Sequence, residues 1–255
     1  MPTAPDSETV SADLPKRKRF VRMLDPYERL VFGGLLVVVL CGWAFIAIAL
    51  NVVDGDAQLL DDRIMLTVRE AVDRVGSDAL GEAGRDLTAL GGYTVLIMLI
   101  VGVCGYLVLV GRRQMLVFLI VSVVGAFVVM MGLKSFYQRP RPALVEHLSY
   151  VDTSSFPSGH SMMSMVVYLT FGALLARISK RKRIKIYCIT FAVAISLLVG
   201  CSRVYVGVHY PTDVLAGWSG GVVWATLSCL VASWFERRGV IGLHEPAEPN
   251  EETAQ

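Results

Sequence analysis

The chain is too apolar and too poor in charge for an ordinary water-soluble domain: its 255 residues are 54% hydrophobic and 18% charged, and its mean hydropathy is +0.56. This composition excludes disordered, collagen-like and water-soluble proteins. Lys and Arg number 24 against 22 Asp and Glu, so the formal net charge of +2 gives no general cationic field of the kind that nucleic-acid-binding proteins carry.

Six apolar segments are long enough to cross a bilayer. Four contain no charged residue, and the two shorter ones can be extended by Lys or Arg side chains that reach the interface from their ends. In chain order the predicted spans are 31–50, 87–111, 115–133, 161–176, 186–202 and 214–235. The sequence therefore predicts an all-α bundle of six transmembrane helices over 23–238, between a disordered polar tail at 1–22 and a polar tail at 239–255.

A further helix is predicted between the first two spans, at 57–75. Its apolar residues, among them Leu60, Ile64, Val68 and Val75, share one helical stripe, with acidic residues and arginines opposite. A helix lying on the outer membrane surface and a helix packed against the outer ends of the bundle both fit this pattern.

The distribution of Lys and Arg predicts the orientation of the spans. With six spans both termini lie on one side, and that side receives 16 of the 24 positive residues, so we expect it to be the cytoplasm. Three clusters of polar residues then lie on the opposite, outer side.

The first polar cluster leaves the third span with the sequence KSFYQRPRP. Lys134 and Arg141 are about two helical turns apart, but Pro140 and Pro142 do not allow the helix to continue, so the second half is expected to be extended. Taken alone, the cluster is explained equally well by cations that anchor the protein at the interface. Arg139 either assists in binding a phosphate or contacts lipid headgroups.

The second cluster, PSGH, opens the fourth span. Ser158 suits the N-cap, Gly159 allows close approach of a ligand to the backbone, and the free N–H groups of a first helical turn form an anion site. His160 would lie beside the bound anion. A structural role is the commoner explanation for a single histidine at a helix start.

The third cluster, SRVYVGVHYPTD, joins the last two spans. Pro211 suits the first position of the sixth helix, and Asp213 falls in its first turn, within reach of His209. A carboxylate bonded to one imidazole nitrogen selects the tautomer and leaves the other nitrogen free to attack or to accept a proton. This pair is the strongest local signal in the chain.

Together the clusters supply what phosphoryl transfer requires: cations to neutralise a phosphate, one histidine as nucleophile and one as general acid. His160, His209 and Asp213 could also form a metal site of two histidines and one carboxylate. A dication beside so many positive side chains is electrostatically unfavourable, so we expect no metal or other cofactor. The five cysteines lie in or beside apolar runs without a C-x-x-C pair, which favours free thiols.

These residues resemble the three-part signature of the type 2 phosphatidic acid phosphatase superfamily in order and in internal spacing. The matching positions are Lys134, Arg141, Pro142, Pro157, Ser158, Gly159, His160, Ser202, Arg203, His209 and Asp213. The resemblance implies a metal-independent phosphatase with the helical core of vanadium haloperoxidases and glucose-6-phosphatase. It implies that His209 forms a phosphohistidine, Asp213 orients it and His160 protonates the leaving group. The phosphate oxygens would be held by Lys134, Arg141, Arg203, Ser158 and Gly159.

Membrane-embedded members of this superfamily act on phosphatidic acid, phosphatidylglycerol phosphate, undecaprenyl diphosphate or phosphorylated lipid A, and the sequence does not choose among these. The compact form is similar to bacterial members, which implies a place in the cytoplasmic (inner) membrane with the site facing the periplasm or the cell exterior. Two alternatives remain open: a lipid-linked phosphotransferase, and a non-catalytic transporter or binder of anionic lipids, which would not need an oriented imidazole. Haloperoxidase chemistry suits six membrane spans less well than a lipid substrate does.

Overall fold

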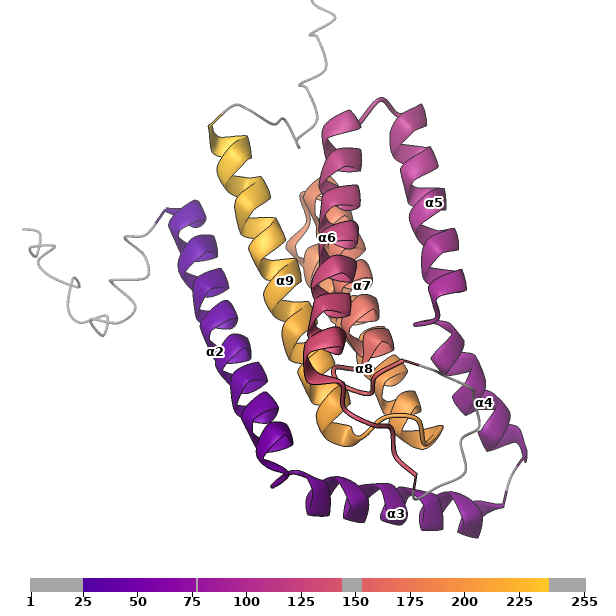
Figure 1. Ribbon diagram of the computed structural model, residues 1–255. Helices are drawn as coiled ribbons and strands as arrows, with labels where there is room; N and C mark the ends of the chain where they lie inside the picture. The colour runs from indigo at the N-terminus through magenta and orange to yellow at the C-terminus, as the bar shows by residue number, and fades with distance from the viewer. Residues whose placement is uncertain (1–24, 77, 144–152, 239–255) are drawn as a thin grey trace, which may run out of the picture.

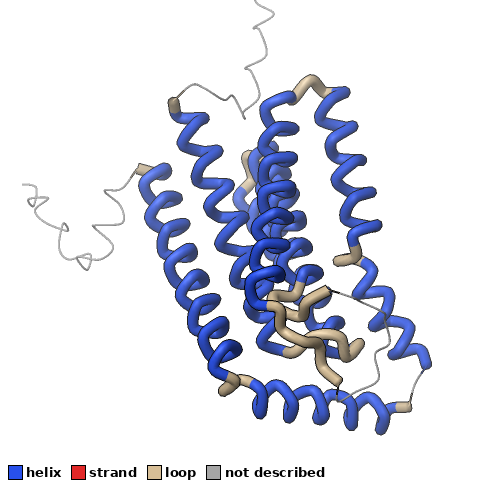
Figure 2. Tube along the Cα trace, in the orientation of Figure 1, coloured by secondary structure: helices blue, strands red, loops and turns tan. Residues whose placement is uncertain are grey.

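The computed structural model describes residues 25–76, 78–143 and 153–238. The tails predicted at 1–22 and 239–255 lie outside these ranges. Within them every regular element is an α-helix, as Figure 2 shows. The all-α prediction is therefore confirmed.

The long helices run side by side, and one shorter helix crosses their lower end (Figure 1). In chain order the helices are α2 (Pro26–Asp54), α3 (Gln58–Val75), α4 (Asp78–Ala89), α5 (Tyr93–Leu109), α6 (Arg113–Tyr137), α7 (Gly159–Ile178), α8 (Lys182–Tyr205) and α9 (Pro211–Arg237). Helix α7 packs against α6, α8 and α9, and α2 lies along α9. Five of these helices are long and apolar enough to cross a membrane, and α4 with α5 forms a sixth, bent candidate. The chain is a multi-pass membrane protein.

The second predicted span, 87–111, is not one straight helix. The chain breaks between Ala89 and Tyr93, and the two helical parts differ in direction by 42°. Two adjacent glycines weaken the helix at this point. A Cβ on Gly91 would lie 2.2 Å from Val199 Cγ1, so only glycine lets the break approach α8 this closely. The Leu90 carbonyl, which the break frees, accepts a hydrogen bond from the Tyr168 hydroxyl at 2.8 Å.

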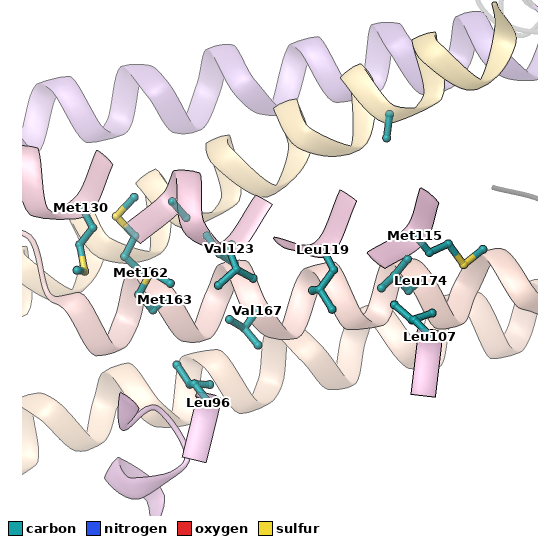
Figure 3. Close-up of a cluster of buried hydrophobic side chains, with 13 residues drawn as sticks. Leu96, Leu107, Met115, Leu119, Val123, Met130, Met162, Met163, Val167 and Leu174 are labelled. Atoms are coloured by element: carbon teal, nitrogen blue, oxygen red, sulfur yellow. The ribbon is translucent and has the colours of Figure 1, made fainter. Parts of the chain in front are cut away.

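The apolar contacts between α6 and α7 form the largest buried cluster, which helix α5 closes on one side (Figure 3). Helix α6 contributes Met115, Leu119, Val123 and Met130, α7 contributes Met162, Met163, Val167 and Leu174, and α5 contributes Leu96 and Leu107. The outward faces of the same helices remain apolar and exposed, as a bilayer requires. Packing among α5, α6 and α7 therefore holds the start of α7 in a defined position.

Glycines bring α9 unusually close to α7. A Cβ on Gly217 would lie 2.7 Å from the Ser158 carbonyl oxygen, and one on Gly221 would lie 2.9 Å from the Met162 carbonyl oxygen. The two glycines are four residues apart, the spacing at which small residues let membrane helices pack backbone to backbone. Close packing therefore brings the beginnings of α7 and α9 together.

Replacing Gly217 with alanine is expected to lower the free energy of unfolding by about 1–3 kcal/mol, because the new methyl group meets backbone atoms that cannot move away. The thermal midpoint of the purified protein in detergent measures this effect. Gly220→Ala is the matched control on the same helix, since the nearest atom to its Cβ lies at an ordinary 3.7 Å. Equal midpoints for the two variants would contradict the role assigned to Gly217.

Helix α3 confirms the helix predicted at 57–75, and it packs on α8 and α9 at the lower end of the bundle. The face toward the bundle carries Asp61 and Met65, both buried. Of the apolar stripe identified in the sequence, Leu60 and Ile64 are exposed and Val68 is partly buried. The helix thus contacts the bundle through a buried carboxylate as well as through apolar side chains.

Candidate active site

The three polar clusters meet at one end of the bundle, beside α3. The end of α6, the start of α7 and the connection from α8 to α9 lie there together (Figure 1). The turns after α5 and α7, the start of α2 and the end of α9 lie at the other end, with most of the described Lys and Arg residues of the predicted cytoplasmic side. The backbone N–H of Ser158 donates to the Asp213 carbonyl oxygen at 2.9 Å, which joins the second cluster to the third.

His209 and Asp213 are in contact, as their spacing predicted. Helix α9 begins at Pro211, which places Asp213 in its first turn. The Nδ1 atom of His209 lies 3.4 Å from Asp213 Oδ2, and both side chains are buried. Oδ2 also accepts the Tyr210 backbone N–H at 2.9 Å and the Ser155 hydroxyl. Asp213 is thus held on several sides, and the Nε2 atom of His209 faces away from it.

The cations of the site lie on the side of His209 that Asp213 does not occupy. An Nη1 atom of Arg141 lies 3.3 Å from His209 Nε2, and the same atom donates to the Val208 carbonyl oxygen at 2.7 Å. Arg141 also donates through Nε to the Thr153 carbonyl oxygen at 2.8 Å. The arginine therefore presents positive charge directly beside His209 Nε2, the ring nitrogen that does not face Asp213.

Arg203 and Lys134 complete this group of positive charges. Arg203 is 1% exposed, and within the described ranges its Nε is a buried nitrogen without a hydrogen-bond partner. Lys134, buried at the end of α6, donates to the Ser154 carbonyl oxygen. A buried, unpartnered guanidinium nitrogen is costly unless an anion occupies the site. The arrangement is that of an anion site that the protein itself does not fill.

The start of α7 forms the remaining wall of the site. Ser158 is the N-cap, as predicted, and its hydroxyl oxygen accepts the Ser161 N–H at 3.5 Å. A Cβ on Gly159 would lie 3.0 Å from Met130 Sδ and 3.5 Å from Lys134 Cε, so α7 packs tightly on α6 at this glycine. The first N–H groups of α7 therefore lie next to the Lys134 side chain.

His160 follows in the first turn of α7 and is only partly buried. Electrostatic interactions connect it with His209, Arg141, Arg203 and Lys134. Its ring lies 6.1 Å from that of Tyr93, measured between centroids. All of the site residues predicted from the sequence thus come together at one end of the bundle.

Four residues near this site were missed or misassigned in the sequence. Arg139 neither faces the cations nor meets the outer surface: it is 9% exposed and forms ion pairs with Asp61 and Asp213. Ser155 donates to Asp213, and the Tyr93 hydroxyl would lie 3.1 Å from a Cβ on Gly159. Of these four residues, only the position of Asp61 could have been noticed as a signal in the sequence. Asp61 is an acidic residue next to the apolar stripe of a predicted amphipathic helix.

The pKa of His209 is lowered from its usual 6.5 to about 4, chiefly by burial. The hydrogen bond with Asp213 opposes this shift, and the charges of Arg141 and Arg203 add to it. The imidazole is therefore neutral near pH 7, with the Nε2 lone pair directed at the Arg141 side of the site. Because the pKa in the folded protein lies below that of the unfolded chain, this group contributes stability above about pH 6.5. That contribution is lost as the pH falls toward 4.

The acid limb of kcat/KM is accordingly expected near pH 4 rather than near pH 6.5 if His209 must be neutral to react. Rates measured with two substrates whose phosphate groups titrate at different pH values check this. A limb that stays in place with both substrates belongs to the enzyme. A common limb centred near pH 6.5 would contradict the depressed pKa of His209.

Metal-ligating side chains are not grouped at this site. Among the residues in the described ranges, no set of three or more His, Cys, Asp or Glu side chains is arranged to hold a metal ion. Positive charge reaches His209 from Arg141 and Arg203, and His160 from these two arginines and Lys134.

Comparison with known proteins agrees with this geometry. The profile of the PAP2 superfamily matches residues 115–237. Phosphatidylglycerophosphatase B of Bacillus subtilis is 42% identical over 95 residues, which cover 36% of this chain and 45% of that protein, so the match spans less than half of that relative. A lipid A 1-phosphatase of Rhizobium etli is 31% identical over 176 residues, 60% of this chain and 72% of that protein.

The fold has a solved counterpart as well. The crystal structure of a transmembrane PAP2 type phosphatidylglycerolphosphate phosphatase from Bacillus subtilis superposes with a TM-score of 0.69 at 27% identity, covering 79% of this chain and 96% of that one. Profile, relatives and fold agree with the signature residues that meet beside α3. The chain belongs to the PAP2 superfamily.

Proposed function

We propose that this protein hydrolyses a lipid phosphate or diphosphate without a metal ion, through a phosphohistidine on His209. One observation carries the proposal: the Nε2 atom of His209, with its partner nitrogen held by Asp213, faces a cluster of cations that includes the unpartnered Nε of Arg203. A site that only binds anions needs the cations but not an oriented, neutral imidazole.

In the first step Nε2 of His209 attacks phosphorus, and the bond from phosphorus to the lipid oxygen breaks. The Nδ1 proton remains on the ring and is held by Asp213, which stabilises the positive charge that the imidazole acquires. His160 enters this step as an imidazolium, which the negative charge of the bound phosphate stabilises, and gives its proton to the departing lipid oxygen. Arg141, Arg203 and Lys134, with the N–H groups at the start of α7, neutralise the phosphoryl oxygens as charge develops on them.

In the second step water attacks the phosphohistidine and releases inorganic phosphate. His160, now neutral, takes the proton from that water, and His209 leaves with its lone pair restored. The enzyme returns to its starting state without an oxidant, a reductant or a metal ion. Transfer to an alcohol acceptor instead of water would use the same intermediate and give the phosphotransferase alternative.

The location of the site supports a membrane lipid as substrate and the outer face of the cytoplasmic membrane as its side. Lys134 and Arg203 lie in the last turns of α6 and α8, two helices apolar enough to cross a membrane, and a lipid headgroup is met at the ends of such helices. The opposite end of the bundle carries the basic turns that are typical of the cytoplasmic side. Substrate candidates are phosphatidic acid, phosphatidylglycerol phosphate, undecaprenyl diphosphate and phosphorylated lipid A.

The test is phosphate release by the purified protein in detergent and EDTA from these four lipids, with His209→Ala purified in parallel as the blank. Release from at least one lipid that the blank lacks is the expected result, and vanadate should inhibit it as a phosphate mimic. Binding of the lipids without any release over a broad pH range would establish the non-catalytic binder instead. Phosphate that appears on an added alcohol acceptor in place of solution would establish the phosphotransferase.

A further inference from the structure

Arg139 bridges two buried carboxylates that come from distant parts of the chain. Its Nη1 atom donates to Asp213 Oδ1 at 2.7 Å, and its Nη2 atom donates to Asp61 Oδ2 at 2.9 Å. Asp61 and Asp213 are both 0% exposed. A pair of buried carboxylates requires a cation, and the planar guanidinium can serve both at once.

Both terminal nitrogens of Arg139 have a second partner within the protein. Nη1 donates to the Thr212 hydroxyl at 2.8 Å and Nη2 to Gln58 Oε1 at 3.2 Å. The guanidinium carbon lies 4.2 Å from the centroid of the Tyr210 ring. Each terminal nitrogen thus has two partners, so neither has an N–H group left to donate to a phosphate. Arg139 therefore belongs to the far side of Asp213 and not to the phosphate-binding cations.

Helix α3 is attached to the start of α9 through the same carboxylate. Asp61 Oδ1 accepts the Thr212 backbone N–H at 3.1 Å, and Asp61 Oδ2 accepts the Thr212 hydroxyl. Gln58, one turn earlier on α3, donates to the Tyr210 hydroxyl at 3.1 Å. These contacts are made with Tyr210 and Thr212, both just before Asp213 in the sequence, so α3 holds the turn from which Asp213 projects.

We propose that Arg139 and Asp61 are positioning residues of the reaction, and that α3 is part of the active site because it holds the Asp213 carboxylate against His209. Asp213 divides its two oxygens: Oδ2 faces His209 Nδ1, and Oδ1 is held by Arg139. Loss of Arg139 or Asp61 frees the second oxygen and lets the carboxylate rotate away from the imidazole. The inference rests on the proposed role of His209.

The experiment compares Arg139→Gln, Asp61→Asn and the double variant in the full-length protein, with phosphate release from the preferred lipid as the readout. We expect kcat to fall about 100-fold, the size of effect that a displaced catalytic group produces, with KM and vanadate inhibition within about twofold of wild type. The double variant should lose no more activity than the less active of the two single variants, because both residues act through Asp213. Arg139→Lys should recover only part of the rate that Arg139→Gln loses. Its ammonium keeps the positive charge but cannot bridge both carboxylates.

Two ion pairs outside the site provide matched controls. Asp73→Asn removes an exposed carboxylate of α3 that pairs with Arg69 at 3.4 Å. Arg177→Gln breaks a 2.7 Å pair with Glu236 at the opposite end of the bundle. Both controls should retain the wild-type kcat. The thermal midpoint of every variant is measured alongside. If Arg139→Gln does not fold, Arg139→Lys and Asp61→Asn provide the test, with a fall in kcat at an unchanged KM as the expected result.

The inference is overturned by a folded Arg139 variant with wild-type kcat, by a rise in KM at unchanged kcat, or by losses that multiply in the double variant. The His209→Ala protein separates this failure from failure of the proposed function. Activity in His209→Ala refutes the phosphohistidine proposal itself. An inactive His209→Ala beside a fully active Arg139→Gln refutes only the role of Arg139 and α3.

Discussion

Replacing His209 with alanine is expected to lower kcat for lipid phosphate hydrolysis by about 10⁴-fold or more, because the variant has no nucleophile to form the covalent intermediate. Neither neighbour can take over: Asp213 lies behind the ring with its oxygens bonded to Tyr210, Ser155 and Arg139, and Arg141 stays charged. Phosphate release in EDTA measures the loss. His244→Ala, in the C-terminal tail, is the matched control and should retain full activity.

A second readout of the same variant identifies the intermediate. Wild-type protein mixed with radiolabelled lipid phosphate and quenched with alkali should hold phosphate in an alkali-stable, acid-labile form, as a phosphohistidine does. His209→Ala should hold none. Labelled protein of the same lability in the variant would show that another residue is the nucleophile, and would contradict the assignment even if the rate has fallen.

Replacing His160 with alanine is expected to lower kcat by about 10²–10⁴-fold for lipid phosphates, the range that a general acid contributes. An alkoxide leaving group requires a proton as the bond to phosphorus breaks, and among the residues that the structure describes His160 is the other histidine at the site. A substrate whose leaving group is already acidic, such as p-nitrophenyl phosphate, needs that proton much less. The loss for this substrate should therefore be far smaller than the loss for the lipid.

The ratio of the two losses separates the chemical role from a structural one. Because His160 lies in the first turn of α7 beside Gly159 and Ser158, its replacement could also disturb the anion site. Damage of that kind would slow both substrates equally and raise KM for each. Equal losses would thus show that His160 binds phosphate or supports the helix start, and would contradict its assignment as the general acid.

Much of the helical architecture could be predicted because its causes are local. Apolar runs without charge predicted the spans, and Ser158 and Pro211 predicted where α7 and α9 begin. The prediction of the second span as a single helix was wrong, because the break at Leu90–Gly92 depends on how closely Gly91 can approach Val199. Apolarity reports that a segment enters a membrane, and it does not report a bend set by a neighbouring helix.

The candidate site likewise has features that the sequence predicted and features that it did not. The contact of His209 with Asp213 follows from four residues of spacing at a helix start, and the cations carry a recognisable order and spacing. The role of Arg139 could not be read, because its partners Asp61 and Asp213 lie 78 and 74 residues away along the chain. From the sequence alone, an arginine just before a proline at the end of a membrane span is indistinguishable from one that meets headgroups.

The sequence by itself determined the all-α membrane class, the end of the bundle at which the polar clusters gather, and the histidines, carboxylate and cations of the candidate site. Each of these depends on composition, on turn chemistry or on spacings within one helix start. Only the tertiary structure decided the bend between α4 and α5, the face on which α3 docks, and the bridge from Asp61 through Arg139 to Asp213. Those features arise where buried charges and close-packed backbones must satisfy one another across long separations in the chain, and no local pattern encodes such a pairing.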